Sequence, residues 1–265
     1  DQIVTTITED DVAFGPENLA IAHDDIDMRI AMSLDAVDMS ERREADPTRM
    51  SGGQQQRVAI AGMLAMNPEI LVLDEPTAML DPQGRADIMH ILDELQQHGT
   101  TIILVTHHRD EFVNADRIIR LDNGRIVQSA RGNTASIPEM DESGTAQEDN
   151  PIAKSNIANG ASKPTSAVPI IEIHNLIYQY PNSSKPVLDK LSITINEGET
   201  VAITGHNGAG KTTLARLLCA LEQPQSGSIT VNTIPVARQR ANGNMQSLKR
   251  ADREKRRATI GYVMQ

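Results

Sequence analysis

Two continuously apolar stretches of the chain flank a segment with helical periodicity. The stretches are Ile70–Leu73 and Thr101–Val105, and polar residues follow each of them. Apolar runs without alternation are typical of strands covered on both faces, as in a parallel sheet packed between helices. Between them, residues 82–97 carry isoleucine and leucine at helical spacing, and Gly99 then favours a helix end. Strand, helix and strand in this order predict a right-handed crossover and an α/β fold.

Strict alternation of apolar and polar residues occurs nearer the C-terminus. Isoleucine and leucine at every second position in 171–173 and 191–195 predict half-buried antiparallel strands. Between these patterns and the first ones, residues 131–168 consist largely of glycine, asparagine, threonine, alanine, serine and proline. Such a segment buries too little apolar surface to offset its ordering entropy, so we expect a flexible linker. The linker separates two globular zones, 1–130 and 169–265.

Composition narrows the possible functions. The 265 residues are 39% hydrophobic, which is enough for a core, and no apolar run approaches the ~20 residues of a membrane span. One cysteine, Cys219, fits a reducing compartment, so we expect a soluble, cytoplasmic protein. The net charge of −11 argues against a nucleic-acid partner. The eight Lys and Arg residues of 238–257 are interrupted by Asp252 and Glu254, which favours a solvated helix over a nucleic-acid patch.

A glycine-rich segment at 205–213 matches the pattern G-x-x-x-x-G-K-[ST]. It follows the strand-like Thr200–Thr204 and precedes a helical segment that starts near Leu214. Glycines let the backbone approach phosphates closely, and amide groups at a helix start favour anions. The alternative, an ordinary glycine-rich turn, does not explain the lysine and threonines at these positions. The predicted nucleotide ligands are Gly205, Asn207, Gly208, Gly210, Lys211, Thr212 and Thr213, with Lys211 on the β- and γ-phosphates and Thr212 on Mg²⁺.

Aromatic residues are scarce, with three Tyr, two Phe and no Trp, so a ring near a binding loop is notable. Tyr180 precedes Pro181 and could stack on a flat base. The alternative is that Tyr178 and Tyr180 are strand aromatics that pack on a sheet, and their spacing fits both interpretations.

A second anion-binding nest is predicted before the helical stretch Val58–Ala61. A serine, two glycines and a glutamine stand there: Ser51, Gly52, Gly53 and Gln54. Small polar residues at a helix start can bind an anion, but by themselves they more often form only a helix cap.

Acidic residues and a histidine follow the two predicted parallel strands. Asp74 and Glu75 end the first strand, where a carboxylate can hold a metal beside a phosphate loop. We expect Asp74 to bind Mg²⁺ and Glu75 to act as the general base on the attacking water. His107 ends the second strand and can hydrogen-bond a γ-phosphate. Taken separately, each has a plainer interpretation: a solvated loop start for the acids and a surface histidine.

Together these motifs resemble the ATP-binding cassette (ABC) ATPases. The resemblance implies a P-loop α/β fold with antiparallel and helical subdomains, ATP and Mg²⁺ as ligands, and ATP hydrolysis. It makes 51–54 the signature motif, although Met50 stands where that family usually has leucine. It implies that Tyr180 stacks on adenine, that His107 is the switch histidine and that Asp81 belongs to a loop that communicates across a dimer. It also makes Gln265 the glutamine that senses metal and transport partner.

The segments Val12–Leu19 and Ala78–Arg85 are most similar to the energy-coupling-factor and cobalt-type importers within that family. This similarity implies uptake of vitamins or metal ions, with transmembrane subunits and a second cassette as partners at the cytoplasmic face of the membrane. Two alternatives stay open: a soluble tandem-cassette translation or repair factor, and a fragment that binds nucleotide without turnover.

The order of the motifs differs from that of a single cassette, in which the phosphate loop comes first. The order predicts a segment of a tandem protein: 1–130 from the later part of a first cassette, 131–168 as linker, and 169–265 from the start of a second. In that arrangement Ser51 and Lys211 would face one shared nucleotide. Alternatively the zones pair as one circularly permuted cassette, which a linker span of about 30–37 Å also permits. We expect the permuted pairing for the isolated chain, because each zone alone has an incomplete sheet.

Overall fold

The computed structural model describes residues 3–112, 114–131, 168–181, 183–239, 245–246 and 259–264, and these form two sheets and five α-helices. The helices are α1 (Thr8–Asn18), α2 (His23–Asp35), α3 (Gly52–Leu64), α4 (Pro82–Gln97) and α5 (Lys211–Leu218), with 3₁₀ turns at η1 (Ser40–Arg42), η2 (Pro47–Arg49) and η3 (Arg109–Phe112). The strands are β1 (Ile70–Asp74), β2 (Thr101–Val105), β3 (Arg117–Asp122), β4 (Arg125–Arg131), β5 (Pro169–Tyr178), β6 (Leu188–Asn196), β7 (Thr200–Thr204), β8 (Ser226–Val231), β9 (Ile234–Gln239), β10 (Met245–Gln246) and β11 (Ile260–Val263).

The larger sheet combines strands from both predicted zones. Its order is β11-β1-β2-β7-β3-β4, and every pair is parallel except β3 with β4. Strand β7 lies between β2 and β3, with Ile102 opposite Thr200 and Arg117 opposite Val201. The two zones therefore pair in the circularly permuted arrangement, and neither provides this sheet alone.

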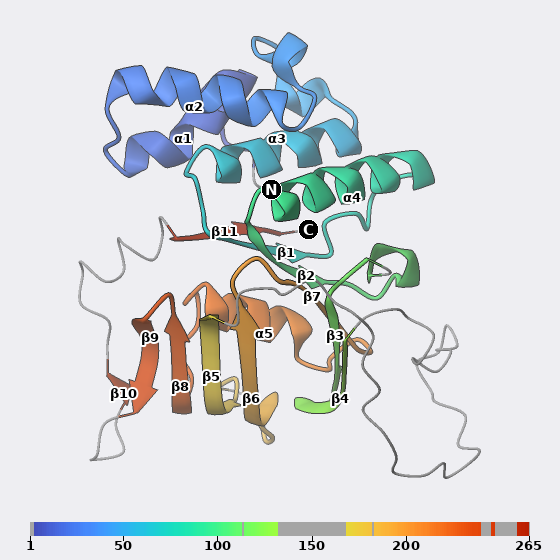
Figure 1. The fold of residues 1–265 in the computed structure, drawn as a ribbon, viewed down its shortest axis with the longest axis vertical. Coiled ribbons are helices and arrows are strands. Elements are labelled where there is room, and N and C mark those ends of the chain that lie inside the picture. The colour runs from blue at the N-terminus through green and yellow to red at the C-terminus, as the bar shows by residue number, and fades with distance from the viewer. Residues whose placement is uncertain are drawn as a thin grey trace.

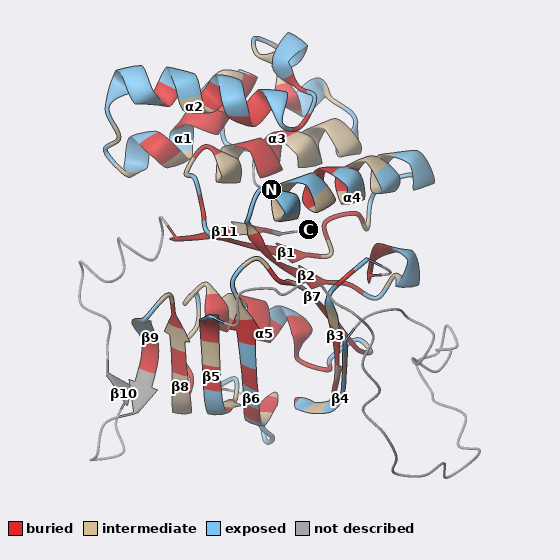
Figure 2. Ribbon diagram, viewed as in Figure 1, coloured by how far each residue is buried: buried red, intermediate tan, exposed pale blue. Residues whose placement is uncertain are grey.

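The central strands have the pattern that the apolar runs predict. All five residues of β1 and all five of β2 are buried, and the two strands pair in parallel. Alternate residues point into two cores: Leu71 and Leu73 pack with α1 to α4, whereas Ile70 and Val72 pack towards α5 and the second sheet. Figure 1 shows these layers, and Figure 2 shows the buried strands between them. The predicted helix at 82–97 is confirmed as α4.

The second sheet is antiparallel, in the order β10-β9-β8-β5-β6. Strands β5 and β6 place Ile171, Ile173, Leu191, Ile193 and Ile195 in one buried cluster with α5, which confirms the alternation at these positions. This sheet lies on the same side of the main sheet as α5, and all three share one core (Figure 1). It therefore packs beside the loop that joins β7 to α5.

Two boundaries differ from the sequence prediction. Arg131 is the last residue of β4, so one end of the predicted linker belongs to a sheet. The other end, Val168, directly precedes β5, and its carbonyl accepts a hydrogen bond of 3.0 Å from Glu197 N–H. The helix predicted over 238–257 is wrong at 238–239 and 245–246, which are strand. The charge pattern led to the prediction of a helix. The backbone is instead strand there, because β9 pairs with β8 and β10 pairs with β9. Residues 132–167 and the rest of 238–257 lie outside the described residues.

Polar contacts hold the turn before β7 against strands of the other zone. Gly198 donates its N–H to the Thr101 hydroxyl at 2.9 Å, and its carbonyl accepts from the Gln96 side chain at 2.8 Å. Arg117 and Glu199 form an ion pair of 2.9 Å with 14% and 5% of their side chains exposed. These contacts fix where β7 enters the sheet, and so where the loop after it lies.

Among the residues that the structure describes, no helix has both the length and the apolar character to cross a bilayer.

Candidate nucleotide site

The glycine-rich loop joins β7 to α5 and has a backbone that only glycine adopts without strain. Gly210 precedes α5 at φ 103°, and a Cβ there would lie 2.8 Å from Leu188 Cδ2 and 3.0 Å from the Val187 carbonyl. Gly205 has φ 147°, and a Cβ there would lie 2.4 Å from the Leu121 carbonyl. The loop is thus wrapped tightly against its neighbours, with amide groups gathered at the start of a helix, where an anion is favoured.

The lysine of this loop is buried and folded over the loop itself. Lys211 Nζ donates to the Gly205 carbonyl at 2.9 Å and lies 3.4 Å from that of His206. Burial lowers the pKa of Lys211, and the carboxylates of Glu75 and Asp74 partly oppose this shift. A buried cation held by two backbone carbonyls of the loop is placed to exchange those contacts for phosphate oxygens.

Asp74 lies at the carboxyl end of β1, directly beside α5. The Thr212 hydroxyl donates to Asp74 Oδ1 at 3.2 Å, and the Tyr262 hydroxyl donates to Oδ2 at 3.4 Å. Burial raises the pKa of Asp74, and the two hydroxyl donors counteract it. Burial likewise raises the pKa of Tyr262, so that phenol keeps its proton and remains a donor.

The pair of Asp74 and Thr212 fits a magnesium ion. Both offer oxygen ligands, which this hard cation requires, and they come from the strand end and helix start that converge at the loop. A carboxylate whose burial is only partly compensated by hydrogen bonds is stabilised by a cation. The third predicted ligand, Gln265, lies outside the described residues.

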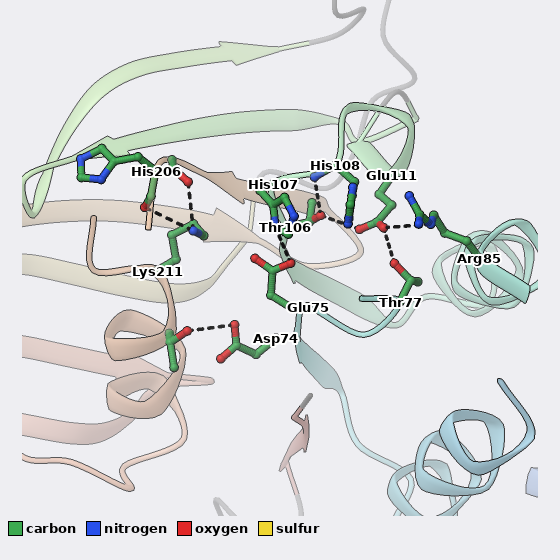
Figure 3. A network of polar contacts seen from close by, with 12 residues as sticks. Asp74, Glu75, Thr77, Arg85, Thr106, His107, His108, Glu111, His206 and Lys211 are labelled. Carbon is green, nitrogen blue, oxygen red and sulfur yellow. Dashed lines mark hydrogen bonds and ion pairs between the residues drawn. The ribbon is translucent and has the colours of Figure 1, made fainter. Parts of the chain in front are cut away.

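Glu75 and His107 meet at the ends of the two adjacent parallel strands. His107 Nδ1 lies 2.6 Å from Glu75 Oε2, an ion-pair approach that is not aligned as a hydrogen bond (Figure 3). Glu75 is largely buried and has φ 52°, a strained backbone for a residue with a Cβ, while its N–H still bonds to the Val105 carbonyl at 2.9 Å. The histidine is half exposed and faces the cavity of the phosphate loop.

One cavity of about 470 Å³ unites most of the predicted residues. It is lined by Glu75, Ala78, His107, Tyr180, Val187, Asn207, Gly208, Gly210, Lys211, Thr212 and Thr213. The phosphate-loop residues come from one predicted zone and the acid and histidine from the other. The structure therefore brings Glu75, His107 and Tyr180 together with most of the predicted phosphate-loop residues, and Asp74 contacts Thr212 beside this cavity.

Both interpretations of Tyr180 describe part of its position. Its ring packs edge-on against Tyr178 at 5.0 Å, as strand aromatics do. Tyr180 also lines the cavity, and its hydroxyl lies 3.1 Å from the Thr213 hydroxyl. Tyr178 is the more deeply buried ring, and burial with the Glu222 hydrogen bond raises its pKa to about 12. Tyr180 is thus the ring available to a base.

The predicted second nest lies at the start of α3, in a different cavity. Ser51 and Gln54 form a capping box in which Ser51 N–H bonds to Gln54 Oε1 at 3.1 Å. A cavity of about 810 Å³ is lined there by Ser51, Gly52, Gly53, Gln54, Met79, Leu80, Asp81 and neighbouring residues of α2, α3 and α4, and none of the described phosphate-loop residues lines it. Within this chain the structure does not bring Ser51 and Lys211 to one site.

A comparison with protein families identifies the relatives of this arrangement. The family model described as ABC transporter matches residues 3–78 and 188–265, which together make up more than half of the chain. The chain belongs to the ABC transporter family. The resemblance expected from the motifs is thereby confirmed, together with its P-loop cassette fold.

Similar ABC proteins share one or both halves of the chain. A putative ABC transporter ATP-binding protein of Bifidobacterium longum is 48% identical over the whole chain, which spans 37% of that protein's length. The energy-coupling factor transporter ATP-binding protein EcfA1 of Clostridium novyi is 55% identical over 48% of the chain and 45% of its own length. A solved structure of cbiO1 from Clostridium perfringens, part of the ABC transporter complex cbiONQ, is 36% identical over 49% of the chain and 53% of its own, with a TM-score of 0.47. The chain thus spans less than half the length of the Bifidobacterium longum and Clostridium novyi relatives.

Two polar contacts at the site were not predicted from the sequence. Tyr262 supports Asp74, and His206 Nε2 lies 2.8 Å from Asp122 Oδ1, which ties the phosphate loop to β3. The scarcity of aromatic residues could have drawn attention to Tyr262, one of three tyrosines. No local signal marks Asp122, because its partner is 84 residues away.

Proposed function

We propose that this chain binds ATP and hydrolyses it as part of the ATP-binding subunit of an ABC transporter. One observation carries the proposal: the cavity around the phosphate loop also contains Glu75 and His107 at the ends of neighbouring strands. A phosphate loop alone would support binding. A buried carboxylate paired with a histidine across the same cavity adds the groups that can orient and deprotonate a water.

Each residue has a role that follows from its place. Lys211 and the loop amides would bind the β- and γ-phosphates, and Tyr180 would stack on adenine. Glu75 would accept a proton from the attacking water while His107 hydrogen-bonds the γ-phosphate. Thr212 and Asp74 would hold Mg²⁺, which when bound neutralises charge on the phosphate oxygens.

We further propose uptake of vitamins or metal ions as the transport function, in the manner of energy-coupling-factor importers. The 55% identity, over 48% of the chain, to a protein named as an energy-coupling factor transporter ATP-binding protein supports this assignment. The proposed partners are transmembrane transporter subunits and a second cassette, which would hold the protein at the cytoplasmic face of the membrane. The names of the similar proteins favour this function over a translation or repair factor, for which ribosome co-sedimentation would be the test.

The motif order supports a tandem parent protein. We propose that 1–130 belongs to a first cassette, 131–168 to the linker and 169–265 to a second cassette. The Bifidobacterium relative supports this proposal, because it matches both zones in the same order within a longer chain. In such a parent, the Ser51 nest and the Lys211 loop of one chain would complete a shared nucleotide site, and Glu75 and Lys211 would serve different nucleotides. The single cavity that holds Glu75 and Lys211 belongs to the permuted pairing of this chain.

ATP binding and turnover by the purified chain test the proposal directly. Lys211→Ala should abolish binding of a fluorescent ATP analogue, since it removes the cation at the phosphates. Glu75→Gln should keep binding and lower kcat by roughly 10²–10⁴-fold, the usual contribution of a general base. Glu94→Gln, which changes a half-exposed acid of α4, is the matched control. Equal turnover in Glu75→Gln and Glu94→Gln would contradict the assignment of the base.

Nucleotide binding without turnover is the second candidate function. It is favoured by the separate position of the cavity of about 810 Å³ around residues 51–54, here called the signature cavity, because no described residue of the phosphate loop lies there. If the site is completed only by a second copy, dilute chain should bind ATP and hydrolyse it slowly, with a rate per molecule that rises with protein concentration. A slow rate that is independent of concentration and insensitive to Glu75→Gln would identify a binding-only chain.

A further inference from the structure

A buried carboxylate outside the cavity connects the two strand ends that carry Glu75 and His107. Glu111 lies in the 3₁₀ turn η3, and only 1% of its side chain is exposed. One carboxylate oxygen accepts the Thr77 hydroxyl, and the other accepts the Thr106 hydroxyl at 2.5 Å. Figure 3 shows the three side chains beside Glu75 and His107. Hydrogen bonds from hydroxyls to a carboxylate are short and among the stronger ones in proteins.

The two hydroxyls belong to the segments that hold the reactive side chains. Thr77 lies two residues after Glu75, within a turn in which Ala78 N–H bonds to the Glu75 carbonyl at 3.2 Å. Thr106 directly precedes His107, and its hydroxyl also accepts the N–H of His108 at 3.0 Å. The Thr106 hydroxyl therefore joins the residues on either side of His107, because it accepts the His108 N–H. The same hydroxyl donates its own proton to Glu111.

A third contact extends this network to the start of α4. Arg85 Nε lies 3.9 Å from Glu111 Oε1, and Arg85 Nη1 lies 3.7 Å from Asp110. The segment between Glu75 and α4 lines both cavities, with Ala78 in the phosphate-loop cavity and Asp81 in the signature cavity. Glu111 thus holds this segment at Thr77 and approaches the helix that follows it.

We propose that Glu111 is a positioning residue that sets the separation and orientation of Glu75 and His107. The inference rests on the proposed hydrolysis. A carboxylate is a costly group to bury, and an apolar side chain could fill the same space at lower cost. The carboxylate accepts hydrogen bonds from Thr77 and Thr106 at once, and these residues follow the neighbouring strands β1 and β2. An apolar residue cannot accept either bond. The role is one of geometry, because Glu111 does not line the nucleotide cavity.

The test compares variants of the full chain in nucleotide binding and turnover. Glu111→Met fills similar volume and removes both acceptor bonds, and should lower kcat on the order of 10²-fold, as misplacement of about 1 Å does. The affinity for ATP should stay within about twofold, because Lys211 and the loop are untouched. Glu111→Gln can keep a bridge between the hydroxyls and should recover most of the loss. Asp110→Asn changes the adjacent, 71% exposed acid and is the control.

Two single-hydroxyl variants provide the second measurement. Thr77→Val and Thr106→Val are close in shape and each removes one arm of the bridge, so each should reduce kcat by less than Glu111→Met. A kcat of Glu111→Met equal to that of Asp110→Asn would overturn the proposal. A parallel loss of ATP affinity and kcat would also overturn it, because that pattern indicates general damage to the fold.

A spectroscopic readout separates this proposal from the proposed hydrolysis. The imidazole NMR signals of His107, assigned with His107→Gln, report its contact with Glu75 without turnover. Glu111→Met and Thr106→Val should shift these signals, whereas Asp110→Asn should not. Unshifted signals in Glu111→Met would refute the positioning role even if ATP hydrolysis is confirmed. Shifted signals in a chain without turnover would support the positioning role and refute the proposed hydrolysis.

Discussion

Asp74 and Lys211 are both buried beside the phosphate loop, and burial shifts each towards its neutral form. The pKa of Asp74 is raised and that of Lys211 is lowered, with loss of solvation as the largest cause in both cases. These charges would be stabilised by the phosphates and the cation of a bound nucleotide. Without it they are a cost to the fold, as is common for residues selected for activity.

Replacing Asp74 by asparagine should therefore stabilise the protein at neutral pH. An acid whose folded-state pKa is raised contributes full stability below its ordinary pKa of 3.8 and loses it as pH rises through the folded value. Asparagine carries no charge and can still accept the Thr212 hydroxyl. Melting temperatures at pH 5 to 8 should show Asp74→Asn above the unmodified chain at pH 7, with the gap narrowing towards acid. Mg²⁺-dependent ATP hydrolysis should be lost, and a lower melting temperature at pH 7 would contradict the argument.

Two loop glycines allow the cost of backbone strain to be measured apart from the cost of a steric contact. Gly208 and Gly210 both have positive φ, 84° and 103°, so alanine at either is strained by about 1–2 kcal/mol. A Cβ at Gly208 meets no heavy atom within 4 Å, whereas one at Gly210 lies 2.8 Å from Leu188. Gly210→Ala should destabilise the chain by about 1–3 kcal/mol more than Gly208→Ala. Urea unfolding measures this difference, and equal losses would show that the contact with Leu188 relaxes without cost.

For single residues, the sequence predicts those whose motif is local and misses those whose partner is distant in the chain. The loop from Gly205 to Thr213 needs only its own spacing and the adjacent strand to be recognised. Glu111 is one of three charged residues in succession, a pattern typical of a surface turn, and only the meeting of Thr77 with Thr106 buries it. Tyr262 gains its contact with Asp74 from strand pairing between distant segments.

Helix α3 shows how one residue can support both an element and a binding surface. The capping box of Ser51 and Gln54 satisfies amide groups at the helix start, and the same groups line the signature cavity. The plain interpretation as a cap is therefore confirmed, and the interpretation as an anion nest stays a proposal.

Two substitutions at Ser51 should separate these roles. Ser51→Ala removes the cap and should lower the free energy of unfolding by about 1 kcal/mol. Ser51→Asp keeps a capping oxygen and should leave stability nearly unchanged, but its charge would repel phosphate. Unfolding in urea and ATP-driven dimerisation measure the two effects. If Ser51→Asp dimerises with ATP as well as the unmodified chain does, the nest is not a phosphate site.

Elements with strong local patterns are predicted well, and elements defined by pairing are not. The apolar runs of β1 and β2 and the spacing in α4 indicate their structure without reference to the rest of the chain. Strands β9 and β10 follow from hydrogen bonds along the second sheet, so the charge pattern of 238–257 misled the prediction there. Backbone pairing between distant strands carries no comparable periodic signal.

The whole molecule depends on contacts between its two zones. Among the described residues, Arg117 and Glu199 form a largely buried ion pair between them. Burial lowers the pKa of Arg117, while Glu199 counteracts that shift. Arg125 and Asp189 also join the zones, but the arginine is 68% exposed. The two pairs therefore offer a matched comparison of buried and exposed contacts across the same interface.

Arg117→Ala should destabilise the chain by about 3–5 kcal/mol, because it leaves the Glu199 carboxylate buried without its partner. Arg125→Ala should cost only about 0–1 kcal/mol, since water and salt screen that pair. Guanidinium unfolding of both variants gives the comparison. Similar small losses in both would show that the junction between the zones tolerates an unpaired charge.

The sequence limits how the two zones can pair to two arrangements, but it does not decide between them. The motif order left a tandem and a permuted arrangement open, and both are compatible with the linker. The structure has the permuted pairing, with β7 between β2 and β3. Which zone pairs with which depends on strand edges that are the same in either arrangement, so the sequence contains no local signal that separates them.

The position of β7 also has a consequence for assembly. A strand that completes a sheet from the far side of a long connection can be supplied by another molecule with the same contacts, which is the basis of domain swapping. Concentrated chain should therefore exchange zones between copies, giving closed dimers or open chains of molecules that dilution slowly returns to monomers. Size-exclusion chromatography after refolding at several concentrations would detect this exchange. In a tandem parent protein, β7 would find its pairing strands within the same polypeptide, where they are always close by.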